Sequence, residues 1–196
     1  GGAAAAAAAS APVPSVQTVL DGGIEQDTPL VTLQELRDGS LWNNSNTSGH
    51  YVACRVRASV RAFWPKDVRD FAMQVGLEIG AESRKKKTYA YRLGLQLASS
   101  RSSDGCVDVM LSNEDAEKFF DGIPAQGFRQ SENRGAADQL SSRMRTLMRA
   151  NAGNSGNEAV ELEFAIKAYR HRHGEEAGVV EGGVPRLRLF GTCLKC

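Results

Sequence analysis

Several residue types on which familiar protein classes depend are scarce in this chain of 196 residues. Four cysteines are too few for the dense disulfide framework of a small secreted domain, so we expect reduced thiols in an intracellular protein. No apolar run approaches membrane-spanning length, so we expect no membrane segment. Lysine and arginine number 24 against 23 acidic residues, which is not the basic excess typical of proteins that wrap nucleic acid.

Signatures of catalysis are also missing from the sequence. It contains no glycine-rich phosphate loop, no His-Glu-x-x-His pattern and no nucleophile elbow. The three histidines, His50, His171 and His173, lie in segments expected to be loops, where solvated histidines outnumber catalytic ones. We therefore expect neither enzymatic activity nor a cofactor.

A zinc site receives only weak support from the sequence. Cys193 and Cys196 have the spacing of a ligand pair, and His171 with His173 could supply a second pair. Ligand pairs of structural zinc sites usually lie on tight turns, whereas Cys193 continues an expected strand. We interpret the two cysteines as unrelated thiols and expect no bound metal.

The hydrophobic fraction of 41% is enough for a core, and much of it lies in alternating runs. A period of two predicts β-strands with one buried face. Such runs cover residues 51–63, 89–97, 106–111, 160–169 and 186–194. The start of the chain is rich in alanine, glycine and proline instead, which predicts a disordered linker over residues 1–28 and a folded domain over 29–196. We also expect the chain to be a piece of a longer protein.

Helical patterns separate some of these runs. Thr32 and Glu35 form a capping box before a short helical turn, and Ser112 begins a second one. The second helix ends in Phe119 and Phe120, which we expect to plug the core. One face of a third helix carries Leu140, Met144, Leu147 and Met148.

The order of these elements is three strands, a helical segment and two strands. Helices between the third and fourth strands are typical of the OB fold. The sequence therefore predicts a mainly β, α+β domain: a five-stranded OB-fold barrel with its helical segment between strands three and four. The interval 65–88 has no clear pattern, and its basic end at 84–87 is expected to lie in the loop between the first two strands.

Two groups of basic residues are candidates for nucleic-acid binding. The three arginines share a strand with aromatic rings, and a groove for single-stranded nucleic acid needs both cations for phosphates and rings for stacked bases. The three lysines fall in a loop where OB domains commonly bind ligands. Ordinary solvated surfaces show the same patterns, so both interpretations stay open. The candidates are Arg55, Arg57, Arg61, Lys85, Lys86 and Lys87.

Three segments carry a family resemblance. Residues 115–125 read Asp-Ala-Glu-Lys-Phe-Phe-Asp-Gly-Ile-Pro-Ala, 163–169 end in Ile-Lys-Ala-Tyr, and 187–192 read Leu-Arg-Leu-Phe-Gly-Thr. Together they resemble the last OB domain of protection-of-telomeres proteins. Vertebrate members carry a resolvase-like insertion with zinc-binding cysteines between the first two barrel strands. Residues 65–88 occupy that place and contain no cysteine, so we expect this chain to lack the insertion and its zinc site.

The resemblance implies a nuclear protein at chromosome ends, part of the shelterin assembly. Its N-terminal OB domains would bind single-stranded telomeric DNA, and this C-terminal domain would bind the bridging subunit of the telomere complex. We expect partner contacts at Tyr89, Tyr91, Arg188 and Phe190. The alternative is a single-stranded DNA- or RNA-binding OB domain of a replication or repair complex, and the net charge of +1 favours protein binding.

Overall fold

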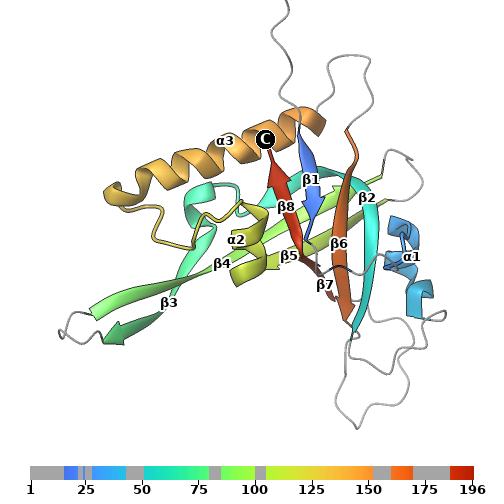
Figure 1. Ribbon diagram of the computed structural model, residues 1–196, viewed down its shortest axis with the longest axis horizontal. Coiled ribbons are helices and arrows are strands. Elements are labelled where there is room, and N and C mark those ends of the chain that lie inside the picture. The colour runs from blue at the N-terminus through green and yellow to red at the C-terminus, as the bar shows by residue number, and fades with distance from the viewer. Residues whose placement is uncertain are drawn as a thin grey trace, which may run out of the picture.

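The centre of the molecule is a closed barrel of five strands (Figure 1). The computed structural model describes residues 16–21, 24, 28–42, 51–79, 85–99, 105–151, 160–169 and 186–196. The barrel strands are β2 (Tyr51–Trp64), β4 (Lys85–Ala98), β5 (Cys106–Ser112), β6 (Leu162–Tyr169) and β7 (Arg186–Phe190). They pair in the closed order β2–β4–β5–β7–β6–β2, and only the β5–β7 pairing is parallel. The predicted fold class, an OB-type barrel, is confirmed.

Period-two alternation explains the barrel core. Along β2, Val52, Cys54, Val56, Ala58 and Val60 are all buried, as the pattern predicts for one face of a strand. The same phase along β4 buries its leucines. The thiol inside this core is affected by its surroundings, because burial raises the pKa of Cys54 to about 12.

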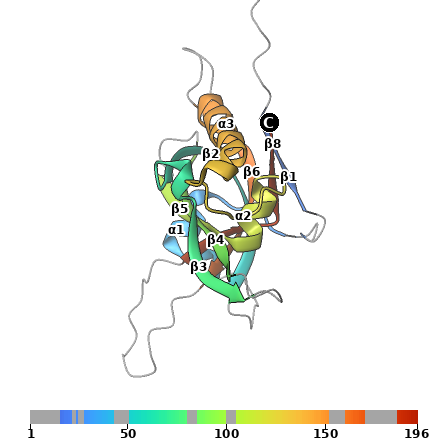
Figure 2. The same ribbon diagram turned by 90° about the vertical axis from the view of Figure 1, so that its left-hand side faces the viewer.

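Three α-helices accompany the barrel in the described part of the chain. They are α1 (Leu33–Asp38), α2 (Asn113–Phe119) and α3 (Arg134–Asn151), and single 3₁₀ turns lie at Ser40–Trp42, Val68–Asp70 and Ser131–Asn133. In both views α3 lies along one end of the barrel, where it packs against β2 (Figures 1 and 2). No helix in the described ranges combines the length and the apolar character needed to cross a membrane.

The two expected capping boxes differ in outcome. Before α1 the box is complete: the Thr32 hydroxyl accepts from Glu35 N, and the Glu35 carboxylate accepts from Thr32 N. Before α2, Ser112 occupies the N-cap position but its side chain makes no capping hydrogen bond. Asn113 has a left-handed backbone with a φ of 47°, which departs from the regular first turn that a capping box requires.

The aromatic end of α2 plugs the barrel, as predicted. Phe119 and Phe120 are fully buried. The Phe120 ring stacks on Phe71 with centroids 5.9 Å apart and lies 5.7 Å from the ring of Tyr91. Phe120 follows α2, Tyr91 belongs to β4 and Phe71 follows the 3₁₀ turn Val68–Asp70, so this cluster ties α2 to the wall of the barrel.

The basic run expected in a loop lies in a strand instead. Residues 72–79 form a strand that the sequence analysis did not predict, β3 (Ala72–Ile79), which pairs antiparallel with the first half of β4. Lys85, Lys86 and Lys87 pair in register with Ile79, Glu78 and Leu77. Backbone hydrogen bonds form whatever the side-chain charge, which is why a lysine run can continue a strand. This β3–β4 arm projects away from the barrel (Figure 1).

The expected linker boundary is wrong over a short stretch. Residues of the predicted linker 1–28 form strand β1 (Gln17–Leu20), which pairs antiparallel with β8 (Thr192–Lys195), and Val16 is buried beside it. The hydroxyl of Thr18 also joins β1 to β6, since it accepts from Glu163 N at 3.1 Å and donates to Glu163 O at 2.7 Å. These contacts anchor β1 to the domain at both of its edges.

The last predicted strand, residues 186–194, is broken into two. Gly191 between β7 and β8 has a positive φ of 49°, a conformation that favours glycine. Thr192 stabilises this turn from inside, because its buried hydroxyl accepts from Ala165 N and donates to Phe190 O. The break directs β8 away from the barrel and toward β1.

Candidate partner-binding surface

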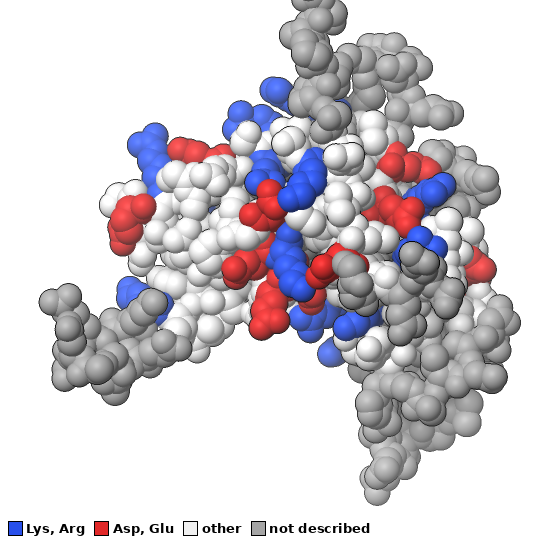
Figure 3. All heavy atoms as spheres, viewed as in Figure 1, with Lys and Arg blue, Asp and Glu red and all other residues white. Residues whose placement is uncertain are grey.

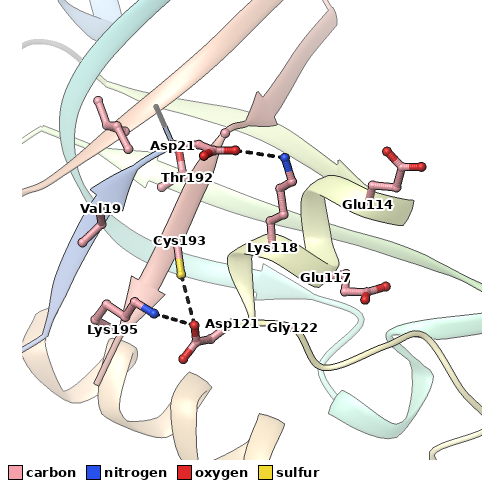
Figure 4. Close-up of a pocket in the computed structure, with 12 residues that line it drawn as sticks. Val19, Asp21, Glu114, Glu117, Lys118, Asp121, Gly122, Thr192, Cys193 and Lys195 are labelled. Atoms are coloured by element: carbon pink, nitrogen blue, oxygen red, sulfur yellow. Dashed lines mark hydrogen bonds and ion pairs between the residues drawn. The ribbon is translucent and has the colours of Figure 1, made fainter. Parts of the chain in front are cut away.

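A groove of about 830 Å³ lies between α2 and the β1–β8 ribbon, and we call it the α2 groove (Figure 4). Its walls come from segments far apart in the sequence. The side chains and backbone that line it belong to Val19, Leu20, Asp21, Glu114, Glu117, Lys118, Asp121, Gly122, Gly191, Thr192, Cys193 and Lys195. Figure 3 shows acidic and basic side chains intermingled over this part of the surface.

Ion pairs bridge the groove. Lys118 reaches from α2 to Asp21 at the end of β1, with Nζ 2.9 Å from Oδ2 (Figure 4). At the other end, Lys195 of β8 contacts Asp121, which also lies 3.4 Å from Arg143 of α3. Hydrogen bonding to Lys195 lowers the pKa of Asp121, and hydrogen bonding to Asp21 raises the pKa of Lys118. The Asp121 carboxylate is therefore charged near neutral pH, where Lys195 and Arg143 occupy it.

Cys193 belongs to this network. Its thiol donates to Asp121 Oδ1 over 3.6 Å. Within the described part of the chain, no three His, Cys, Asp or Glu side chains gather as a metal site would require. His50, His171 and His173, the last two of which the zinc hypothesis needed, lie outside the described residues.

A second hollow of about 490 Å³ adjoins the α2 groove and shares Asp21, Lys118 and Gly191 with it. We call it the aromatic hollow because Tyr51 and Phe190 line it. Lys167 also lines it, with Nζ 4.9 Å from the centroid of the Tyr51 ring and 4.6 Å from that of Phe190. The Lys167 cation therefore lies against both rings within the hollow.

The four residues predicted to contact a partner do not share one surface. Phe190 lies in the aromatic hollow, and Arg188 lies near it, paired with Asp115 of α2 at 2.8 Å. Tyr89 is half-buried elsewhere, where its hydroxyl accepts a hydrogen bond from Gln130.

For Tyr91 the prediction of a partner contact is wrong. The side chain is 1% exposed, and its hydroxyl donates to Ile123 O at 2.9 Å. Tyr91 has the inward phase of the β4 alternation, as Leu93 and Leu95 do, so its position in the strand decides its burial.

The basic residues predicted to bind nucleic acid are not brought together either. Arg55 and Arg57 both contact Glu163 of the neighbouring strand β6, at 2.9 Å and 3.4 Å. Arg55 also donates from Nε to Thr28 O. Arg61 lies at the other end of β2, near Cys106 of β5, and the three lysines are on the β3–β4 arm. Glu163 thus offsets much of the positive charge of Arg55 and Arg57.

Sequence reasoning missed the residues that build the α2 groove. Asp21 and Lys195 lie in segments interpreted as linker and chain end, and nothing local marks either as part of a site. A usable signal did exist in α2, where Glu114, Glu117 and Lys118 lie beside the aromatic plug. Buried Phe119 and Phe120 fix which face of α2 turns outward, and these charged residues lie on it.

Comparison with known proteins supports the fold alone. No protein-family description matches the sequence, and no curated protein matches it either. A chain in the crystal structure of fission yeast Pot1 and Tpz1 is similar, with a TM-score of 0.60 and 16% sequence identity. The match covers 91% of this chain and 97% of that chain. At this identity the similarity establishes a common OB-type architecture, and function has to be argued from the site.

Proposed function

We propose that this domain is the protein-binding module of a telomere-capping protein, located in the nucleus at chromosome ends. Its partner would be the bridging subunit of the telomere complex, and other OB domains of the same protein would bind the single-stranded overhang. The proposal involves no catalytic step and no cofactor. It has support from the similarity to one chain in the structure of Pot1 and Tpz1, two proteins solved together. The match covers nearly the whole of this chain and of that one.

One observation carries the proposal. Two of the segments that resemble protection-of-telomeres proteins, residues 115–125 and 187–192, are the segments that line the α2 groove and the aromatic hollow. Several residues of those motifs that are not buried in the core, Lys118 and Gly191 among them, therefore lie along one open surface. A binding role accounts for that placement, because a surface hollow adds nothing to the stability of the barrel.

The chemistry of this surface suits a polypeptide. Val19 is 48% exposed and Tyr51 is 41% exposed, so a docked segment can remove apolar and aromatic surface from water. Ion pairs such as Lys118–Asp21 surround these side chains and provide a polar rim. An apolar centre with a polar rim is the usual anatomy of a protein interface.

The same features argue against tight binding of single-stranded nucleic acid by this domain. Affinity for phosphate depends on cations that are free to release counterions on binding, and Arg55 and Arg57 are already paired with Glu163. With a formal net charge of +1, few phosphates are neutralised at once. We expect dissociation constants on the order of 10⁻⁶ M or weaker at physiological salt, which is the range of non-specific binding.

A co-purification experiment tests the proposal. The chain is co-expressed with the telomere-complex bridging subunit encoded in the same genome, and the mixture is analysed by size-exclusion chromatography with light scattering. We expect a stable complex of the two proteins. A fluorescence titration with telomeric single strand is the counter-test. Absence of the complex together with tight, sequence-selective DNA binding would replace this function with the alternative of a nucleic-acid-binding OB domain.

A further inference from the structure

We infer that the α2 groove takes an apolar polypeptide segment that carries lysine or arginine residues placed to pair with Glu114 and Glu117. The inference rests on the proposed function for the identity of the partner, and it adds the chemistry by which that partner is recognised. It comes from the distribution of charge in the groove, where the carboxylates of Glu114 and Glu117 make no ion pair with a described residue.

The charges that line the groove do not balance. Four carboxylates face two ammonium groups, those of Lys118 and Lys195. Each ammonium already has an aspartate: Lys118 pairs with Asp21, and Lys195 pairs with Asp121. The remaining excess is two negative charges.

That excess lies on the outward face of α2. Glu114 is exposed and Glu117 is half-buried, and among the described residues neither side-chain carboxylate makes a hydrogen bond or an ion pair (Figure 4). The nearest basic residue on the helix, Lys118, is turned toward Asp21. Arg188, which also approaches α2, is turned toward Asp115. A bound cation from outside the domain is the partner that this arrangement lacks.

The floor of the groove is apolar and lies beside these carboxylates. Val19 and Leu20 contribute from β1, and nothing lies within 4 Å of the place where Gly122 lacks a Cβ, so the backbone there is open to close approach. Val19 is 48% exposed, so the floor is not covered by the domain itself. A segment that places an apolar side chain here has Glu114 and Glu117 within reach of its flanking residues, which are then favoured to be basic.

Charge complementarity separates this occupant from others. An acidic segment or a nucleic-acid strand would bring more negative charge to the unpaired glutamates. A second copy of this chain would bring the same acidic face, because a two-fold contact places identical patches together. A basic, partly apolar segment is the occupant whose charge fits.

The test uses two labelled peptides and the full 196-residue chain. In one short peptide leucine alternates with lysine, and in its counterpart glutamate replaces every lysine. Binding is followed by fluorescence anisotropy, and amide chemical shifts of Val19, Gly122 and Gly191 report whether the groove is the site. The chain is compared with its double variant Glu114→Gln/Glu117→Gln and with a control, Glu132→Gln/Asp138→Asn, that removes two exposed acids elsewhere.

We expect the lysine peptide to bind in the groove, the glutamate peptide not to bind, and the double variant to lose about tenfold in affinity while the control does not. Added salt should reduce that difference. The inference is overturned if the lysine peptide does not bind, if its shifts map elsewhere, or if the double variant and the control behave alike.

Failure of this inference can be told apart from failure of the proposed function. A chain that co-purifies with its bridging subunit with an affinity unchanged by Glu114→Gln/Glu117→Gln overturns this inference alone. A chain that binds the lysine peptide in the groove but no telomere-complex subunit overturns the proposed function alone.

Discussion

The barrel interior and the α2 groove are built by different physical means. In the interior, apolar side chains alternate along long strands and are buried almost completely, as Val56, Leu95 and Phe164 are. Around the groove, ion pairs between exposed side chains join two four-residue strands, β1 and β8, to α2 and the turn that follows it. Buried apolar area contributes far more to stability than exposed ion pairs do. The stability of the fold therefore depends mainly on the barrel interior, and the groove can change its side chains at little cost in stability.

The largest expected effect comes from breaking the interior. Phe120→Ala removes a fully buried ring that contacts Phe71, Phe119 and Tyr91, so the free energy of unfolding should fall by about 3–5 kcal/mol. Urea denaturation followed by circular dichroism measures this loss. The matched variant in the groove is Val19→Ala, at a half-exposed position, and it should cost less than about 1 kcal/mol. Similar losses in the two variants would remove the distinction between the regions.

A smaller effect tests whether β1 belongs to the domain. Thr18→Val leaves Glu163 N and O without their hydroxyl partner at a half-buried position, and should cost about 1 kcal/mol of unfolding free energy. Thr146→Val is the control, because its exposed hydroxyl bonds only to Ser142 O within α3. If both variants are as stable as the unmodified chain, β1 contributes nothing to the fold and behaves as the linker that composition predicted.

The smallest effect concerns an ion cluster on the barrel rim, outside both regions. The Arg69 side chain, by hydrogen bonding, lowers the pKa of Asp67 to about 2 from its ordinary value of 3.8. A carboxyl with a depressed folded pKa stabilises the fold above its unfolded pKa, and that stabilisation is lost as the pH falls through the folded pKa.

Asp67→Asn should therefore flatten the stability profile between about pH 4 and pH 2, by less than about 1 kcal/mol because the pair is solvent-exposed. Denaturation midpoints over that range measure the effect. A variant whose midpoints fall as steeply as those of the unmodified chain would show that Asp67 is not the titrating group.

The sequence predicts the barrel interior well and the α2 groove poorly. Period-two alternation predicted the barrel strands, and the Thr32 capping box predicted α1, because each signal is local and repeated. Strand β3 also alternates, with Met73 and Val75 on one face, but those side chains are exposed and a register shift follows at Gly76. An alternating face that is not buried carries little information, and the strand was not predicted.

The groove was not predictable by local rules. Its ion pair Lys118–Asp21 joins positions 97 residues apart, and Glu163 lies more than 100 residues from the arginines that it pairs with. Such partners become visible only when the topology is known. Phe190, predicted as a partner contact, lines the aromatic hollow, whereas Tyr91 is buried because the phase of its strand places it inside.

We propose that the surface around α2 binds a protein, whereas the arginines of β2 contact neither that protein nor nucleic acid. The most direct measurement is the affinity of the chain for the telomere-complex bridging subunit in two variants, each checked for folding by circular dichroism. We predict that Phe190→Ala weakens binding about tenfold. We predict that Arg55→Gln/Arg57→Gln changes it by less than about twofold. Unchanged affinity in the first variant, with tight telomeric single-strand binding that the second abolishes, would contradict the account.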